Sequence, residues 1–133
     1  MDCSCEISVV SFAIPPSLAN CGPEGADAAA ICPQCLTVGA VSDGAASKSP
    51  DEPDFSRVSD AMPTGEAGVA MALLLGSLDS LVGNRAAIET ALEHAERTGA
   101  DPLLCLDRLL ADPSVNPHVD LERRRVQLES FVY

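Results

Sequence analysis

Two close pairs of cysteines stand near the start of the chain, Cys3 with Cys5 and Cys32 with Cys35. Four thiolates can surround a zinc ion tetrahedrally when each pair lies on a tight turn. Pro33 has a restricted φ and favours such a turn within the second pair. Four sulfurs complete the coordination shell, so a zinc ion held in this way is structural and not catalytic. The spacing therefore predicts a structural zinc site at these four cysteines.

Other interpretations of these cysteines stay open. Disulfides need an oxidising compartment, and the first residues lack the basic and apolar regions of a secretory signal. Buried thiols without a ligand are common in protein cores. Redox catalysis by Cys32 and Cys35 would need a helix after the pair, whereas LTVGAV at 36–41 is typical of a strand. A rubredoxin-like iron site would use the same sulfurs, but only 3% of the residues are aromatic, too few for the dry shell around such an iron.

The remaining candidate residues are predicted to be structural. Cys21 lies in the same region and could replace one cysteine of the first pair, although a spare thiol in a loop is the simpler interpretation. Cys105 stands among leucines and is typical of a small core residue. His94 lies between acids and His118 in a turn, so both are expected to be solvated. The basic run at 123–125 is surrounded by acids, which indicates a helix face of ion pairs rather than a phosphate site.

The charge of the chain narrows the function classes. The 133 residues include 20 acids and 8 bases, which gives a net charge of −12. Such a field opposes binding to nucleic acid and to anionic membranes, and residues 1–41 contain no Lys or Arg. No apolar run reaches the roughly 18 residues that span a bilayer. Because no secretory signal is found, we expect a cytoplasmic protein. Because no catalytic triad, phosphate loop or HExxH motif is present, we expect that it is not an enzyme.

The acids are spread along the whole chain, and Lys48 is its only lysine. Asp and Glu keep a protein soluble better than Lys does. At molar salt the Debye length is only about 3 Å, so repulsion between acids is largely screened. This composition predicts a protein adapted to a very salty cytoplasm. The alternative is an ordinary acidic protein, which would usually keep more lysine.

The first half of the chain is predicted to hold two short strands and a linker. ISVVSFAI at 7–14 and LTVGAV at 36–41 are β-branched and apolar, as strands are. Residues 15–31, rich in Pro, Gly and Ala, are expected to form a loop. A strand after each cysteine pair is the arrangement of a zinc ribbon. Residues 42–63 form an acidic, Pro- and Ser-rich linker, and the scattered apolar residues at 55–63 are expected to dock as an extended segment.

From Thr64 the apolar residues follow a helical period. The first helix, with Thr64 as its cap, is apolar nearly all round and is expected to be buried in the centre. Asn84 and Asp101 are the expected caps of the next two helices. The final segment is rich in Glu and Arg and is predicted to be a helix, although its alternation also fits a strand. The expected helices span 66–82, 85–98, 102–111 and 121–130, and the buried face of the third holds Leu103, Leu106 and Leu110.

Parts of the chain resemble known proteins. The CPQC turn at 32–35 and the CSC pair at 3–5, in an acidic and lysine-poor chain, resemble the small CPxCG-type zinc-finger proteins of haloarchaea. The stretches MPTGEAGVAMALLLGSLDSL (62–81) and GADPLLCLDRLLADPSVNPHVDLERRR (99–125) are similar to a haloarchaeal family of unknown function. The resemblance implies a cytosolic archaeal protein with a metal-binding N-terminus and no known activity. The chain departs from the pattern because its first pair is one residue short and neither pair is followed by glycine.

These patterns together predict an α+β protein. A zinc-ribbon-like β-hairpin unit (1–41) is joined by the linker (42–63) to a bundle of three or four α-helices (64–133). So short a hairpin buries little apolar surface, and metal binding would contribute folding free energy. The expected function is that of a non-enzymatic zinc-binding protein of a halophilic archaeon, acting as an interaction or regulatory module for a protein partner. The alternatives are a nucleic-acid-binding zinc ribbon and a thiol or redox protein.

Overall fold

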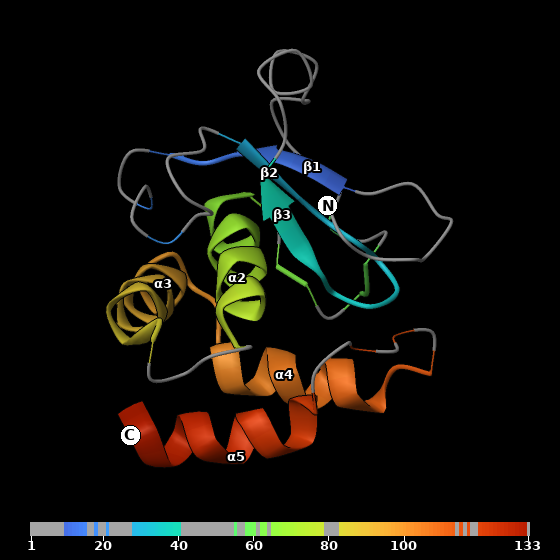
Figure 1. The fold of residues 1–133 in the computed structure, drawn as a ribbon, viewed down its shortest axis with the longest axis vertical. Coiled ribbons are helices and arrows are strands. Elements are labelled where there is room, and N and C mark those ends of the chain that lie inside the picture. Colours follow the sequence, from blue (N-terminus) through green and yellow to red (C-terminus); the bar gives the residue numbers. More distant parts are fainter. Residues whose placement is uncertain are drawn as a thin grey trace.

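The computed structural model describes residues 10–15, 18, 21, 28–40, 55, 58–60, 62–63, 65–78, 83–113, 115, 117 and 120–132. Within these residues the fold is α+β, as predicted, with an antiparallel sheet of three strands followed by four helices (Figure 1). The strands are β1 (Val10–Ala13), β2 (Ala28–Ile31) and β3 (Val38–Ala40). The helices are α2 (Gly65–Ser77), α3 (Arg85–Arg97), α4 (Pro102–Ala111) and α5 (Leu121–Val132).

Strand β2 is the centre of the sheet, and it corrects the sequence prediction. The loop expected at 15–31 contains this strand, so the two predicted strands are not neighbours but pair with β2 from either side. Val10 lies opposite Ile31, which in turn lies opposite Val38. The sequence of β2, AAAI, has little intrinsic preference for a strand. All four of its residues are buried, so small side chains suit a place where both faces of the strand are covered.

Helix α2 lies beneath the sheet and above α4 and α5, in the middle of the molecule (Figure 1). Ten of its 13 residues are buried, so the expectation of a central, buried helix is confirmed. Two glycines allow its close packing. A Cβ atom on Gly68 would stand 2.4 Å from the ring of Phe55, and one on Gly76 would stand 2.7 Å from Cβ of Val38. The helix ends at Ser77 instead of residue 82, and residues 79–82 lie outside the described part.

The three later helices agree with the predicted boundaries within one or two residues. Asp101 caps α4, because its side chain accepts a hydrogen bond from the backbone N–H of Leu104 at 3.1 Å. Asn84 stands at the cap position of α3, but its side chain instead donates to the carbonyl of Ser77 at 3.0 Å. The end of the chain is a helix, as favoured over a strand. The expected cap Thr64 lies outside the described residues.

One detail of the predicted core is wrong. Leu110 was expected on the buried face of α4, but 40% of it is exposed, while Leu109 beside it is buried. Elsewhere the predicted stripe of α3 is confirmed, since Ile88, Ala91, Leu92 and Ala95 are all buried. A single cluster of buried side chains runs from the sheet through these helices. Of the helices in the described residues, none is both long and apolar enough to cross a membrane.

Phe55 connects the segment at 55–63 to this cluster. Its ring lies 5.6 Å from that of Phe12 on β1, centroid to centroid, at a tilted angle of 54°. Val58 and Met62 are buried as well, so apolar residues of this segment dock on the core as expected. The described residues form turns and not the expected extended segment, since the N–H of Val58 donates to the carbonyl of Phe55 at 3.0 Å and that of Met62 to the carbonyl of Ser59 at 3.1 Å. The hydroxyl of Ser59 donates to the carboxylate of Asp112 at 2.7 Å, which ties the segment to the residue that follows α4.

Candidate metal centre

The turn between β2 and β3 contains the second cysteine pair and is formed by Cys32, Pro33, Gln34 and Cys35. The backbone N–H of Leu36 donates to the carbonyl of Cys32 at 3.0 Å, which closes the turn. The N–H of Cys32 donates to the carbonyl of Thr37 at 2.9 Å, which extends the pairing of the two strands. Both cysteines therefore lie within a single hydrogen-bonded turn, as the spacing predicted.

Leu36 adopts a backbone conformation that normally belongs to glycine. Its φ is +62°, and it is the one residue other than glycine with a positive φ in the described part of the chain. The left-handed conformation brings Cβ too close to the following carbonyl and costs about 1–2 kcal/mol. The side chain of Leu36 is only 2% exposed, so its burial in the core offsets this cost. The turn thus keeps a left-handed residue at the place where a CPxCG turn has its glycine.

The two cysteines of the turn are free thiols protected from solvent. Cys32 is fully buried and Cys35 is 8% exposed. The sulfur of Cys35 lies 3.0 Å from the hydroxyl oxygen of Thr37, so the hydroxyl could donate a hydrogen bond to a thiolate here. Two thiols on one turn supply half of the ligands of a tetrahedral zinc site. The chemistry of these side chains fits zinc, and two more ligands are needed.

The other predicted pair, Cys3 and Cys5, lies outside the described residues. In the described part of the chain, no group of three or more His, Cys, Asp or Glu side chains is arranged to hold a metal ion. The start of β1 lies beside the turn, because Val10 pairs with Ile31 and Cys32 directly follows Ile31. Val10, the first described residue of β1, therefore lies at the end of the sheet that carries the second cysteine pair.

Cys21 does not group with the cysteines of the turn. Its thiol donates to the carbonyl of Ala87 in α3 at 3.3 Å. Burial raises the pKa of this thiol to about 11, because the charged thiolate would lose its solvation. The side chain is therefore protonated at neutral pH and lies against a helix. The alternative in which Cys21 replaces a ligand is not supported, since no third potential ligand lies with Cys32 and Cys35 among the described residues.

Cys105 and His94 belong to the helical part. Cys105 is a buried core residue, as predicted, and burial is the main cause that raises the pKa of its thiol. The expectation that His94 is solvated is wrong. Its side chain is only 13% exposed, and Nε2 lies 3.0 Å from a carboxylate oxygen of Glu66, which joins α3 to α2. Glu66 is 28 residues away in the sequence, so the local acids of α3 could not reveal it. His118 lies outside the described residues.

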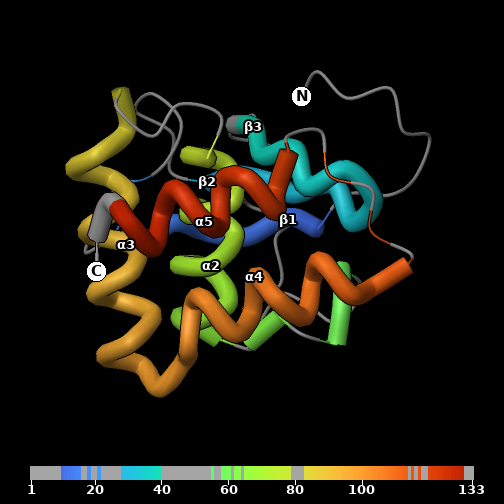
Figure 2. Tube along the Cα trace, turned by 90° about the horizontal axis from the view of Figure 1, so that it is seen from below, coloured from blue at the N-terminus to red at the C-terminus, as the bar shows by residue number. Residues whose placement is uncertain are grey.

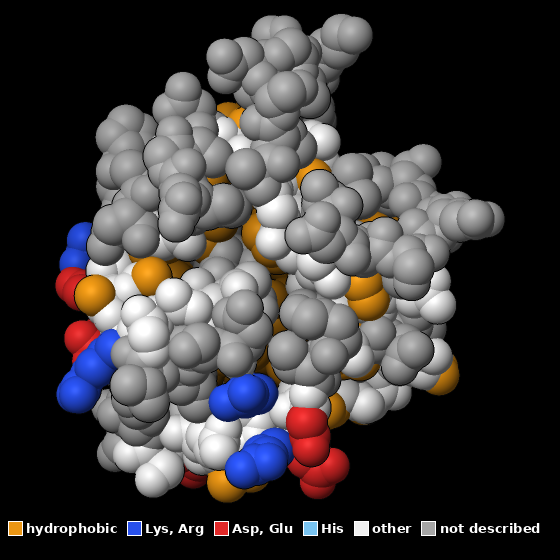
Figure 3. Space-filling view, viewed as in Figure 1, with side chains coloured by type: hydrophobic (Ala, Val, Ile, Leu, Met, Phe, Trp, Pro, Cys, Tyr) orange, Lys and Arg blue, Asp and Glu red, His pale blue; other side chains and the backbone are white. Residues whose placement is uncertain are grey.

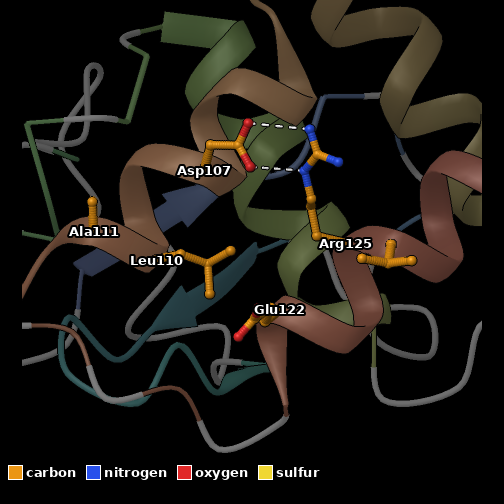
Figure 4. A pocket seen from close by; sticks show the side chains of 6 residues that line it. Asp107, Leu110, Ala111, Glu122 and Arg125 are labelled. Atoms are coloured by element: carbon orange, nitrogen blue, oxygen red, sulfur yellow. Dashed lines mark hydrogen bonds and ion pairs between the residues drawn. The ribbon is translucent and has the colours of Figure 1, made fainter.

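Within the basic run at 123–125, Arg125 forms ion pairs, as expected, whereas Arg124 donates a hydrogen bond to Gln127 at 3.2 Å. Arg125 holds Asp107 of α4 through two contacts, from Nε at 2.8 Å and from Nη2 at 3.1 Å (Figure 4). It also pairs with Glu129. The hydrogen bond to Asp107 is the main cause that raises the pKa of the guanidinium. Acidic and basic side chains lie next to each other along the lower edge of the molecule, where α5 lies (Figure 3).

Comparison with known proteins places the chain in a family. The sequence model of that family matches residues 2–132, which is nearly the whole chain. The chain belongs to a family of unknown function (DUF6276). No curated protein and no solved structure matches it. Membership of DUF6276 confirms the predicted likeness to a family of unknown function, and it assigns neither a ligand nor an activity.

Two features of the candidate site and its surroundings have no local signal in the sequence. The first is the left-handed conformation of Leu36, since the sequence shows only that no glycine follows Cys35. The second is the pairing of Arg125 with Asp107, because the acids expected around the basic run were those of its own segment. A groove between α4 and α5, lined in part by Leu110, also has no signal in the sequence, because it depends on how the two helices cross.

Proposed function

We propose that the chain binds one structural zinc ion through Cys3, Cys5, Cys32 and Cys35. In this proposal it is a non-enzymatic interaction module of the zinc-finger kind. The observation that supports the proposal best is the turn at 32–35. It combines two solvent-protected free cysteines with a left-handed residue directly after the second one. The left-handed residue stands where a CPxCG turn has its glycine, which supports a turn of the zinc-binding kind.

The small sheet gives a physical reason for a metal. Its strands have four, four and three residues, and sheets of this size gain little stability from pairing alone. A zinc ion bound by residues on both sides of the sheet end would contribute folding free energy directly. Closed coordination by four sulfurs would leave no position for a substrate, which agrees with a module that is not an enzyme.

The charge supports a protein partner in a salty cytoplasm. With a net charge of −12 and no Lys or Arg in residues 1–41, the metal-binding end would repel the phosphates of nucleic acid. The same acid excess, with a single lysine, is what a halophilic protein needs to stay hydrated and soluble. No observation in the described part of the chain favours the nucleic-acid alternative or the redox alternative.

Metal analysis combined with thiol counting tests the proposal. The chain is purified with zinc and a reductant, and zinc is measured by mass spectrometry while thiols are titrated before and after chelation. We expect one zinc per chain, with Cys21 and Cys105 as the thiols that react before chelation in mild denaturant, and all six cysteines after it. Cys32→Ser should lose the zinc, whereas the matched variant Cys105→Ser should keep it. A chain with six free thiols and no zinc would contradict the proposal.

Single substitutions also test the ligand set. Cys5→Ser should lower zinc affinity by a large factor, because removal of one thiolate opens the shell, while Cys21→Ser should leave it unchanged. The opposite result would show that the first pair is not part of the site. For the interaction role, native chain and zinc-free Cys32→Ser are compared as baits in a lysate at high salt. A partner retained equally by both baits would show that the interaction does not need the zinc ion.

A further inference from the structure

The exposed apolar side chains gather on the last two helices. Of the large hydrophobic residues that the structure describes, those most open to solvent are Leu104, Leu110 and Val126, at 51%, 40% and 59%. Leu104 and Leu110 belong to α4, and Val126 belongs to α5. These helices lie side by side at the edge of the molecule, away from the sheet (Figures 1 and 2). Apolar side chains that collect on one part of a surface are typical of binding sites.

Two of these side chains line a shallow groove between α4 and α5. The groove has a volume of about 490 Å³, which is enough for a few side chains of a partner. Leu110 projects into the space between the helices, with the pair of Asp107 and Arg125 at one end and Glu122 at the other (Figure 4). The lining residues are Asp107, Leu110, Ala111, Glu122, Arg125 and Val126.

The walls of the groove are held in place by the ion pairs across it. Arg125 contacts both carboxylate oxygens of Asp107, which joins α5 to α4. Glu129, one turn further along α5, also pairs with Arg125 and restrains its side chain. A groove fixed in this way loses little conformational entropy when it is occupied.

The groove carries more acid than base. Asp107 and Glu129 share the single guanidinium of Arg125, so this cluster keeps an excess carboxylate. Glu122 is exposed and has no hydrogen bond or ion pair with any residue that the structure describes. Carboxylates at the ends of an apolar groove are complementary to a segment that presents an apolar side chain next to a cation.

We propose that the groove between α4 and α5 binds a basic amphipathic helix of a partner protein. An apolar side chain of that helix packs on Leu110 and Val126, and a Lys or Arg one turn away pairs with Glu122. A second copy of this chain fits poorly, because its own groove would bring the same excess of carboxylates. The inference gives a partner chemistry to the interaction role proposed above, and it does not depend on the metal.

A designed peptide tests the groove. The probe is a fluorescent helical peptide of about 18 residues, with Leu along one face and Lys beside it, and the control peptide has Glu in place of Lys. Binding is followed by fluorescence anisotropy at low and at molar salt. The variants are Val126→Ser, which removes the apolar contact, and Glu122→Gln, which removes the charge. Glu89→Gln on α3 is the matched control, because it makes the same change of charge on another helix.

We expect Val126→Ser to weaken binding about tenfold or more. Glu122→Gln should weaken it about three- to tenfold at low salt and less at molar salt, and Glu89→Gln should change it less than about twofold. Both positions are exposed, so the Tm of each variant should lie within a few degrees of the Tm of the native chain.

Three results would overturn the inference. They are no binding of the Lys peptide, equal weakening by Glu122→Gln and Glu89→Gln with no effect of Val126→Ser, and self-association of the native chain that Val126→Ser abolishes. The first result would show that there is no site, and the second would show attraction by net charge alone. The third would show that a second copy of the chain occupies the groove. Zinc content is measured on every sample. Specific peptide binding by a chain that holds no zinc would support the groove proposal and refute the zinc proposal. A chain that holds zinc but does not bind the peptide would support the zinc proposal and refute the groove proposal.

Discussion

Replacing Leu36 by Ala and by Gly separates the two effects that meet at this residue. Its side chain is buried, with 2% exposed, and its φ is +62°. Alanine removes most of the side chain but keeps the Cβ that makes a left-handed backbone costly. Glycine removes the side chain and the strain together. At an ordinary buried position glycine is the worse of the two replacements, whereas here it should be the better one.

The magnitudes follow from the structure. Loss of a buried leucine side chain costs about 2–5 kcal/mol, and Leu36→Ala should lose an amount in this range. In Leu36→Gly the left-handed strain of about 1–2 kcal/mol disappears, and the extra freedom of glycine in the unfolded chain costs about 0.5–1 kcal/mol. The glycine variant should therefore be more stable than the alanine variant by up to about 1.5 kcal/mol. Both variants remain less stable than the native chain.

Urea unfolding at constant salt and constant metal content measures the difference. A change of about 1 kcal/mol shifts the midpoint by about 0.3–1 M. Leu106, which is fully buried in α4, provides the control pair Leu106→Ala and Leu106→Gly. There glycine should be less stable than alanine by about 1 kcal/mol, as in any helix interior. If Leu36→Gly were also less stable than Leu36→Ala, the left-handed conformation and the turn built on it would be refuted.

Three further substitutions test the packing and the electrostatics. Gly76→Ala improves intrinsic helix propensity but should destabilise the chain by about 1–3 kcal/mol, because the new Cβ would stand 2.7 Å from Cβ of Val38. Thermal unfolding measures this loss, and a rise in Tm would contradict the close packing of Gly76 on Val38. Asp101→Ala should cost about 1 kcal/mol through loss of the hydrogen bond from Leu104, and Asp101→Asn should cost much less. The pKa of Cys21 is raised to about 11 from 9.0, so the folded chain holds this proton more tightly and its stability should fall as pH rises from 9 to 11. The loss is at most about 2–3 kcal/mol; a parallel pH profile for Cys21→Ala would show that this thiol does not contribute.

The helices could be predicted because local signals and tertiary packing agree there. The apolar run of α2 is too evenly distributed for a surface helix, and the structure buries it on all sides. In α4, Asp101 followed by Pro102 marks a helix start by chemistry that needs no tertiary contact. The end of α5 was ambiguous from alternation alone, and its Glu and Arg content decided correctly for a helix.

The strand β2 could not be predicted because its residues say little about their surroundings. Ala28, Ala29 and Ala30 favour a helix by propensity, and only burial between two partner strands makes them suitable for a sheet. The misassigned Leu110 has the same origin. Its position on α4 is one step from the buried Leu109, and whether it faces the core or the groove depends on where α5 crosses.

At Leu36 the chain has leucine where a CPxCG turn has glycine, and the core explains this difference. A glycine after Cys35 would satisfy the turn alone, at no steric cost. Leucine satisfies the core alone, since its buried side chain is worth more than the strain it imposes. The chain accepts the strain because the turn sits directly on the apolar cluster that includes Ile31 and Leu36. In a fold with strands this short, the turn at 32–35 is thereby anchored by the core. The turn should therefore keep its shape without a metal, whereas at the proposed zinc site Cys3 and Cys5 would be linked to the turn only through the metal. Hydrogen exchange with and without a chelator distinguishes the two parts: the N–H of Leu36 should stay protected in both states, and loss of its protection on chelation would refute this order of dependence.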